Sequence, residues 1–157
     1  MASGAKVNPA HLAAAVLTAP LLCLGIPLAI PSLREWLMDA SEFVPRTDCG
    51  PGWTESLVSV AQISETMIFC AYTILSVALF WWYELTAATL SKREAVAVAI
   101  WSAFVFACGL THLTGRVMFN YPCYRLDTLV RVYCDLASLA AVVHAPILVR
   151  MDTWFQK

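Results

Sequence analysis

The chain has 157 residues, of which 60% are hydrophobic and only 13% are charged. A soluble domain usually carries about twice that charged share, so the composition is typical of an integral membrane protein. The net charge of -1 argues against a nucleic acid as the partner. A chain of this length has room for roughly three or four spanning helices joined by short loops.

Four apolar runs are each close to, or longer than, the roughly 20 residues that a helix needs to cross the hydrocarbon core. They cover residues 11–30, 57–83, 95–119 and 128–149. The sequence therefore predicts an all-α integral membrane protein in which a three-helix bundle follows one additional hydrophobic helix. The predicted segments are an N-terminal hydrophobic helix or signal anchor at 1–31, a lumenal loop at 32–56, the bundle at 57–150 and a cytosolic tail at 151–157.

The first apolar run allows two interpretations. Lys6 precedes it, as in a signal peptide, but the run is longer than the usual apolar region of about 7–15 residues, and no small-x-small cleavage site follows. We favour an uncleaved span; a cleaved signal would leave three helices. With four spans, both termini are expected in the cytosol, because Lys and Arg slightly favour that side. The cytosolic side would hold Lys6, Lys92, Arg93, Arg150 and Lys157, and the opposite side would hold Arg34, Arg46, Arg116 and Arg125.

The third run contains a thiol and an imidazole, Cys108 and His112, four residues apart. On a helix, residues at this spacing share one face. A thiolate and an imidazole together suit soft copper(I). The alternative is a cysteine that packs as a small apolar residue beside a histidine with an ordinary hydrogen bond. Thr111 is expected to bond back to a helix carbonyl, and Gly109 to let another helix approach closely.

Polar residues also occur in the second and fourth runs. Glu65 and Tyr72 lie seven residues apart, about two helical turns, and therefore share a face. Glu65 is either an interfacial carboxylate or a support for a site between helices. Arg131 is expected to pair with Asp135, one turn on, or to reach Glu65 across the bundle. His144 lies near the cytosolic end of its run, and we interpret it as interfacial.

Two of the six cysteines, Cys49 and Cys123, fall in loops that would share the lumenal side. A disulfide is permitted in that compartment. The sequence leaves three arrangements open: a bond between these two residues, a bond between two copies of Cys49, or free thiols.

The segment from Phe104 to Leu113, FVFACGLTHL, resembles the second helix of the ethylene-binding domain of plant and cyanobacterial ethylene receptors. The first helix of that domain carries an acidic residue followed seven positions later by tyrosine, which Glu65 and Tyr72 resemble. Arg131 resembles a basic residue in the first turns of its third helix. The resemblance covers about residues 49–149.

In that family, the cysteine and the histidine hold copper(I), copper binds ethylene, and the domain works as a homodimer in the endoplasmic reticulum. The resemblance therefore implies Cys108 and His112 as metal ligands. It implies that Glu65, Tyr72, Phe104, Val105 and Arg131 are supporting residues. Cys49 resembles a cysteine of the lumenal lead-in that joins two subunits through a disulfide.

The chain departs from the family pattern at several positions. The usual aspartate is Glu65, a proline four residues after the tyrosine is Ser76, and Cys49 lacks the closely spaced second cysteine. No kinase, GAF or receiver domain is present in the 157 residues. Three expectations follow from this: the sequence is a piece of a longer protein, the signal passes through a downstream partner chain, or the domain has another use.

Two other functions stay open. The chain is alternatively a structural subunit of a larger membrane assembly, or a membrane metal or haem protein that binds no olefin. The sequence shows no Ser/His/Asp set, no paired acids at a pocket and no phosphate-binding glycine loop, so we do not expect an enzyme.

Overall fold

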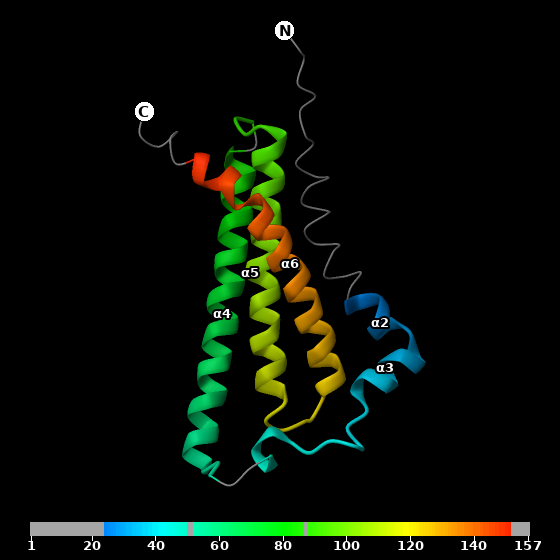
Figure 1. Cartoon of the computed structure of the whole chain (residues 1–157). Coiled ribbons are helices and arrows are strands. Elements are labelled where there is room, and N and C mark those ends of the chain that lie inside the picture. Colours follow the sequence, from blue (N-terminus) through cyan, green and yellow to red (C-terminus); the bar gives the residue numbers. More distant parts are fainter. Residues whose placement is uncertain (1–23, 50–51, 87, 152–157) are drawn as a thin grey trace.

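The computed structural model describes residues 24–49, 52–86 and 88–151, and these residues form helices and connections without a strand. Three long helices run alternately up and down beside one another (Figure 1). They are α4 (Glu55–Thr86), α5 (Lys92–Val117) and α6 (Tyr124–Met151). Each is long and apolar enough to cross a membrane. The three-helix bundle predicted from the apolar runs is therefore confirmed as a set of helices.

The segment before the bundle differs from the prediction. Residues 11–23 of the first apolar run lie outside the described residues. The rest of that run forms the short helix α2 (Ile26–Ala29), and α3 (Pro31–Met38) begins directly afterwards. Ile30 between them has an extended backbone, because a residue that precedes proline is kept out of the helical region. Most of α3 and the 3-10 turn η2 (Arg46–Asp48) occupy residues that were predicted to be a loop.

Helix α5 begins three residues before the predicted apolar run, because Ser91 and Glu94 form a capping box. The Glu94 carboxylate accepts the Ser91 backbone N–H at 2.7 Å, and the Ser91 hydroxyl accepts the Glu94 N–H at 3.4 Å. This reciprocal arrangement satisfies two donors that would otherwise lack partners at the helix start. The polar residues Lys92 to Glu94 are thus the first turn of α5.

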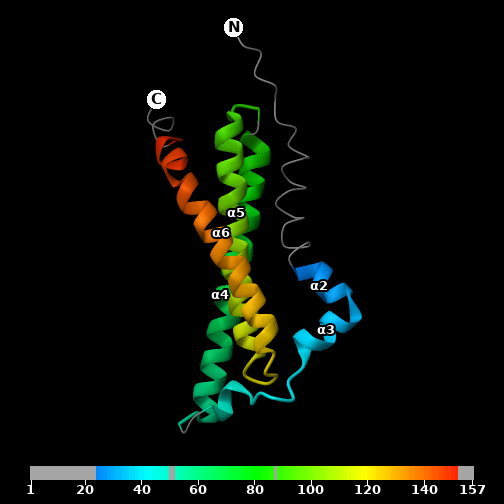
Figure 2. The same cartoon turned by 45° about the vertical axis from the view of Figure 1, so that its right-hand side comes forward.

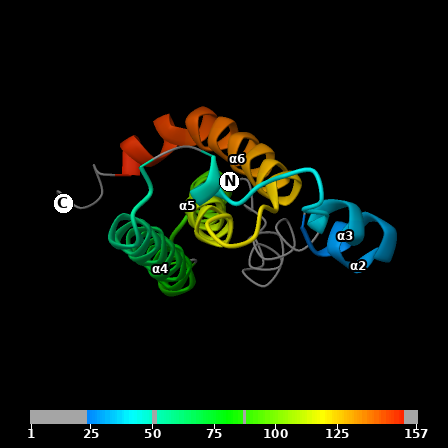
Figure 3. The ribbon, with the colours of Figure 1, turned by 90° about the horizontal axis from the view of Figure 1, so that it is seen from below.

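Helix α5 is the middle helix of the bundle, with α4 and α6 on either side of it (Figure 3). In the most apolar window of each helix, 39% of α5 is buried inside the structure, against 6% of α4 and 11% of α6. The outer helices consequently expose large apolar side chains, such as Leu85 and Val143. Such faces are what a lipid environment would cover.

Two serines join α4 and α5 across their interface. Each of the buried Ser76 and Ser102 donates its hydroxyl to the backbone carbonyl of the other, at 2.9 and 3.0 Å. Hydrogen bonds between membrane helices contribute roughly 0.6–2 kcal/mol each. Helix α4 continues through Ser76 without interruption.

Gly109 sets how closely α4 and α5 approach. A Cβ atom added there would lie 3.3 Å from Tyr72 Cβ, whereas one added at Gly25 would have no atom within 4 Å. We expect Gly109→Val to lower the free energy of unfolding by about 1–3 kcal/mol, since the core must shift to admit the side chain. Thermal unfolding of the detergent-purified chain measures this loss, and Gly25→Val is the matched control. Equal melting of the two variants would contradict the close packing.

The segment after α3 is fastened to the start of α6 at the lower end of the bundle (Figure 2). The Arg125 guanidinium donates to the Trp36 carbonyl at 3.1 Å and contacts the carboxylates of Asp39 and Glu42 at 3.1 and 2.9 Å. Hydrogen bonds from Ser41, and then the guanidinium of Arg125, hold the pKa of the Asp39 carboxyl below its ordinary value. The residues that follow reach the end of α5, where the Arg46 backbone N–H donates to the Met118 carbonyl.

Candidate metal centre

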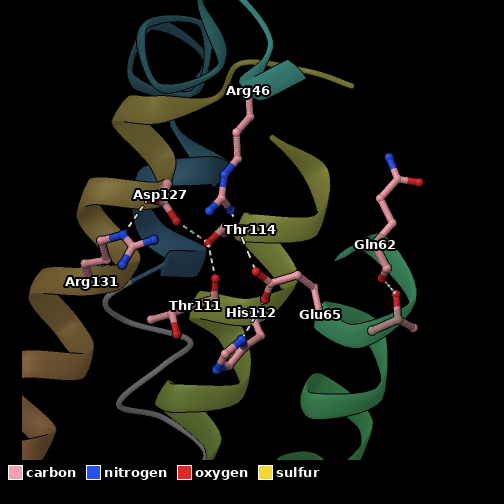
Figure 4. Close-up of polar contacts among 9 residues, drawn as sticks. Arg46, Gln62, Glu65, Thr111, His112, Thr114, Asp127 and Arg131 are labelled. Atoms are coloured by element: carbon pink, nitrogen blue, oxygen red, sulfur yellow. Dashed lines mark hydrogen bonds and ion pairs between the residues drawn. The ribbon is translucent and has the colours of Figure 1, made fainter. Parts of the chain in front are cut away.

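The centre of the candidate site is a hydrogen bond between α5 and α4. His112 Nδ1 lies 2.6 Å from the Glu65 carboxylate (Figure 4). An ionised carboxylate can only accept, so a neutral imidazole that bonds to it through Nδ1 carries its proton there and keeps the lone pair on Nε2. The His112 and Glu65 side chains are 31% and 22% exposed. The prediction that Glu65 supports a site between helices is consistent with this contact.

Tyr72 contacts the same imidazole from one side. Its ring centroid lies 5.8 Å from that of His112, with the rings tilted by 50°. Tyr72 lies about two turns after Glu65 on α4, so both side chains reach His112, as their shared face predicts. The expected close approach at Gly109 is present as well, because Tyr72 lies directly against it.

Arg46 extends the site beyond the long helices. Its guanidinium lies 3.7 Å from Glu65 Oε1 and 5.0 Å from the centroid of the Phe119 ring. Its backbone N–H donates to the Met118 carbonyl at 3.0 Å, which fixes η2 at the end of α5. Glu65 therefore lies between a cation and an imidazole (Figure 4). Arg46 was not among the predicted site residues, since no local sequence pattern links it to Glu65.

Cys108 faces the other neighbour of α5. Its Sγ lies 3.6 Å from Cys134 Sγ on α6, and both side chains are partly buried. Thr111 donates to the Cys108 carbonyl at 2.7 Å, which confirms the expected bond back to the helix. The predicted ligands Cys108 and His112 thus lie one turn apart on α5. The Cys108 thiol contacts Cys134 of α6, whereas the His112 imidazole contacts Glu65 of α4. Within the described residues, no group of three or more His, Cys, Asp or Glu side chains is placed to hold a metal ion.

The predicted partners of Arg131 were wrong. Its Nε donates to Asp127 at 2.6 Å, and it bonds neither to Asp135 nor to Glu65. Long side chains on a helix point back toward its N-terminus, which favours a partner four residues earlier over one four residues later. Asp127 also accepts the Thr114 hydroxyl of α5 at 2.5 Å and is 5% exposed. Arg131 therefore belongs to a link between α5 and α6, next to the histidine site (Figure 4).

The remaining predicted residues have other neighbours. Val105 is buried, and the Phe104 ring packs edge-on against Trp101 at 5.7 Å, one turn from Cys108. Their contribution to a pocket stays a prediction. Cys49 and Cys123 are free thiols in the single chain, so they form no bond with each other. Burial raises the pKa of Cys123, and a bond between two copies of Cys49 stays a prediction.

These contacts define a helical protein with a carboxylate–histidine pair between two helices of membrane-spanning length. Comparison with protein-family models, with curated proteins and with solved structures finds no match to this chain. The likeness to the ethylene-binding domain therefore rests on the residues quoted above.

Proposed function

We propose that this chain is a membrane sensor module that binds ethylene through a copper(I) ion held by Cys108 and His112 within the bilayer. The observation that carries the proposal is the hydrogen bond from His112 Nδ1 to Glu65. A histidine that binds a metal almost always donates its other ring N–H to a carboxylate, a carbonyl or water. The bond fixes the tautomer, orients the ring and leaves Nε2 as the ligand atom.

The donor set fits the metal. Thiolate sulfur and imidazole nitrogen are ligands that select copper(I) over harder ions. When bound, copper(I) supplies a soft, electron-rich centre that an alkene can approach. Cys108 and His112 bind the ion, Glu65 orients the imidazole, and Tyr72 covers one side of the ring. The apolar helices around these residues suit a small neutral gas and exclude water.

The proposal includes the surroundings that the resemblance implies. The three long helices cross the membrane of the endoplasmic reticulum, and the termini face the cytosol if the first span is retained. Two copies associate as a homodimer, and a downstream partner chain carries the signal. The apolar outward faces of α4 and α6 support the membrane location.

Copper dependence of ethylene binding tests this function. Membranes that carry the chain are expected to bind radiolabelled ethylene when copper(I) is supplied. A copper(I) chelator such as bathocuproine disulfonate is expected to remove that binding, and renewed copper to restore it. Membranes without the chain serve as the control. Binding that the chelator leaves unchanged, or no binding by a copper-loaded chain, would contradict the proposal.

A further inference from the structure

Asp135 places a carboxyl group on the outer face of a helix long enough to cross a membrane. It lies 11 residues after Tyr124 and 14 residues before Val149, the two ends of the candidate span in α6. At 1.5 Å per residue, Asp135 is roughly 16 Å from one end and 21 Å from the other, inside a hydrocarbon core about 30 Å thick. Ionisable side chains at this depth almost always face a partner or a water-filled cavity.

The single chain supplies no such partner among its described residues. The Asp135 side chain is exposed, and it makes no hydrogen bond or ion pair within the described part of the chain. The nearest basic residue along α6 is Arg131, whose Nε donates to the buried Asp127 at 2.6 Å. That bond holds the guanidinium toward the start of α6, away from Asp135.

The outer face of α4 provides a contrast. From Met67 to Trp81, the sequence of α4 contains no charged residue. Its exposed side chains there include Met67, Ile74 and Trp81, which lipid can cover without cost. The outer face of α6 differs from this face by a carboxyl group in the middle of the span.

The exposed residues around Asp135 form a stripe along α6. They follow one another in alternating steps of three and four residues: Val132, Asp135, Leu139, Val142, Pro146 and Val149. This is the spacing of residues through which two helices pack side by side. The stripe lies opposite Val130 and Ala141, which are buried. Helix α6 is at the edge of the bundle, with α5 between it and α4, so the stripe is open to a neighbour (Figure 3).

A second copy of the chain fits this stripe. Around a two-fold axis along the helices, each residue of the stripe meets its own counterpart, so Asp135 meets the partner's Asp135. Two carboxylates in contact repel, and the pair therefore keeps at least one proton. The O–H of one carboxyl then donates to an oxygen of the other. Lipid chains offer no hydrogen bond to this group.

We propose that the stripe on α6 is the contact surface of a homodimer, in which Asp135 hydrogen-bonds to the partner's Asp135. This inference rests on the homodimer of the proposed function and deepens it, because it assigns that dimer a surface. The hydrogen bond between His112 and Glu65 lies on the opposite side of α5, between α5 and α4, so the contact leaves it undisturbed.

Sedimentation equilibrium of the full chain in a density-matched neutral detergent measures the dimer. Asp135→Leu is expected to weaken dimerisation about 3- to 30-fold, the loss of one hydrogen bond between membrane helices. Asp135→Asn is expected to keep it, because an amide both donates and accepts. Ser64→Leu is the matched control, since Ser64 is an exposed polar residue of α4. Far-UV circular dichroism checks that each variant folds.

A cross-linking experiment in membranes examines the surface without changing Asp135. Val142→Cys and Ile74→Cys each place a thiol at an exposed apolar position, on α6 and α4 respectively. A bifunctional maleimide is expected to give more cross-linked dimer than wild type only for Val142→Cys. Wild type serves as the background, because the chain has cysteines of its own.

A monomeric wild type would overturn the inference, whether lipid, a foreign protein or another segment of the chain covers Asp135. Equal dimerisation of wild type and Asp135→Leu would overturn it too, as would cross-linking at Ile74→Cys in place of Val142→Cys. The copper content of the same preparations tests the proposed function separately. Copper in a chain that does not dimerise through α6 would leave the candidate metal centre intact, and a dimer without copper would leave only the contact surface.

Discussion

Replacing His112 with alanine is expected to abolish copper retention by the purified chain and ethylene binding by its membranes. The substitution removes the Nε2 ligand atom and also the group that Glu65 orients at 2.6 Å. Because Cys108 would be left without the imidazole ligand, the ion would be lost to a chelator that wild type resists. Metal analysis after chelator treatment, followed by ethylene binding, measures both losses.

His144→Ala is the matched control for this prediction. His144 hydrogen-bonds at 2.8 Å to the carbonyl of Ala140 in its own helix. It lies twenty residues beyond the start of α6, whereas His112 lies five residues before the end of α5. At 1.5 Å per residue, the two histidines differ by roughly 20 Å in height, which also disfavours a haem shared between them. Full copper retention by His112→Ala would remove histidine from the site, and loss in both variants would point to general unfolding.

The three long helices could be predicted from the sequence because their apolar runs exceed the length of a membrane span. The ends of these helices were predicted less accurately, because polar residues outside the apolar runs belong to the helices as well. Lys92 to Glu94 belong to α5 because of a capping box, which the Ser91-x-x-Glu94 pattern could have revealed. In the segment before the bundle, Pro31 starts a helix as well as ending one.

Within the candidate site, contacts along one helix could be predicted and contacts between distant segments could not. The spacing of Glu65 and Tyr72 placed both on the face that meets His112. The approach of Arg46 and of Cys134 depends on how η2 and α6 are docked, and no local pattern encodes that. Hydrophobic periodicity specifies which face of a helix is buried, but it does not specify the axial register of two helices.

The pairing of Arg131 illustrates a different kind of error. An aspartate lies four positions from Arg131 on each side, Asp127 before it and Asp135 after it. Side-chain direction on a helix distinguishes the two, because the Cα–Cβ bonds tilt toward the N-terminus. The observed bond to Asp127 follows that direction and leaves Asp135 one turn beyond. The correct partner was therefore available from helix geometry alone.

Glu65→Gln is expected to weaken copper binding by about 10- to 100-fold, the usual cost of losing a second-shell partner of a ligating histidine. The amide keeps the length of the side chain but lacks the charge that holds the Nδ1 proton and faces Arg46. Ethylene binding at subsaturating copper is expected to fall with it. Competition with a copper(I) chelator measures the change, and Glu55→Gln at the start of α4 is the matched control.

Arg46→Gln separates the two contacts that Glu65 makes. The Arg46 ion pair is long, at 3.7 Å, and the arginine side chain is 42% exposed, so it contributes at most about 1 kcal/mol. Copper affinity is therefore expected to fall by less than about fivefold in Arg46→Gln, well short of the loss in Glu65→Gln. Equal losses in the two variants would mean that the charge of Glu65 acts through Arg46 rather than on His112. Affinity unchanged in Glu65→Gln would remove the carboxylate from the candidate metal centre.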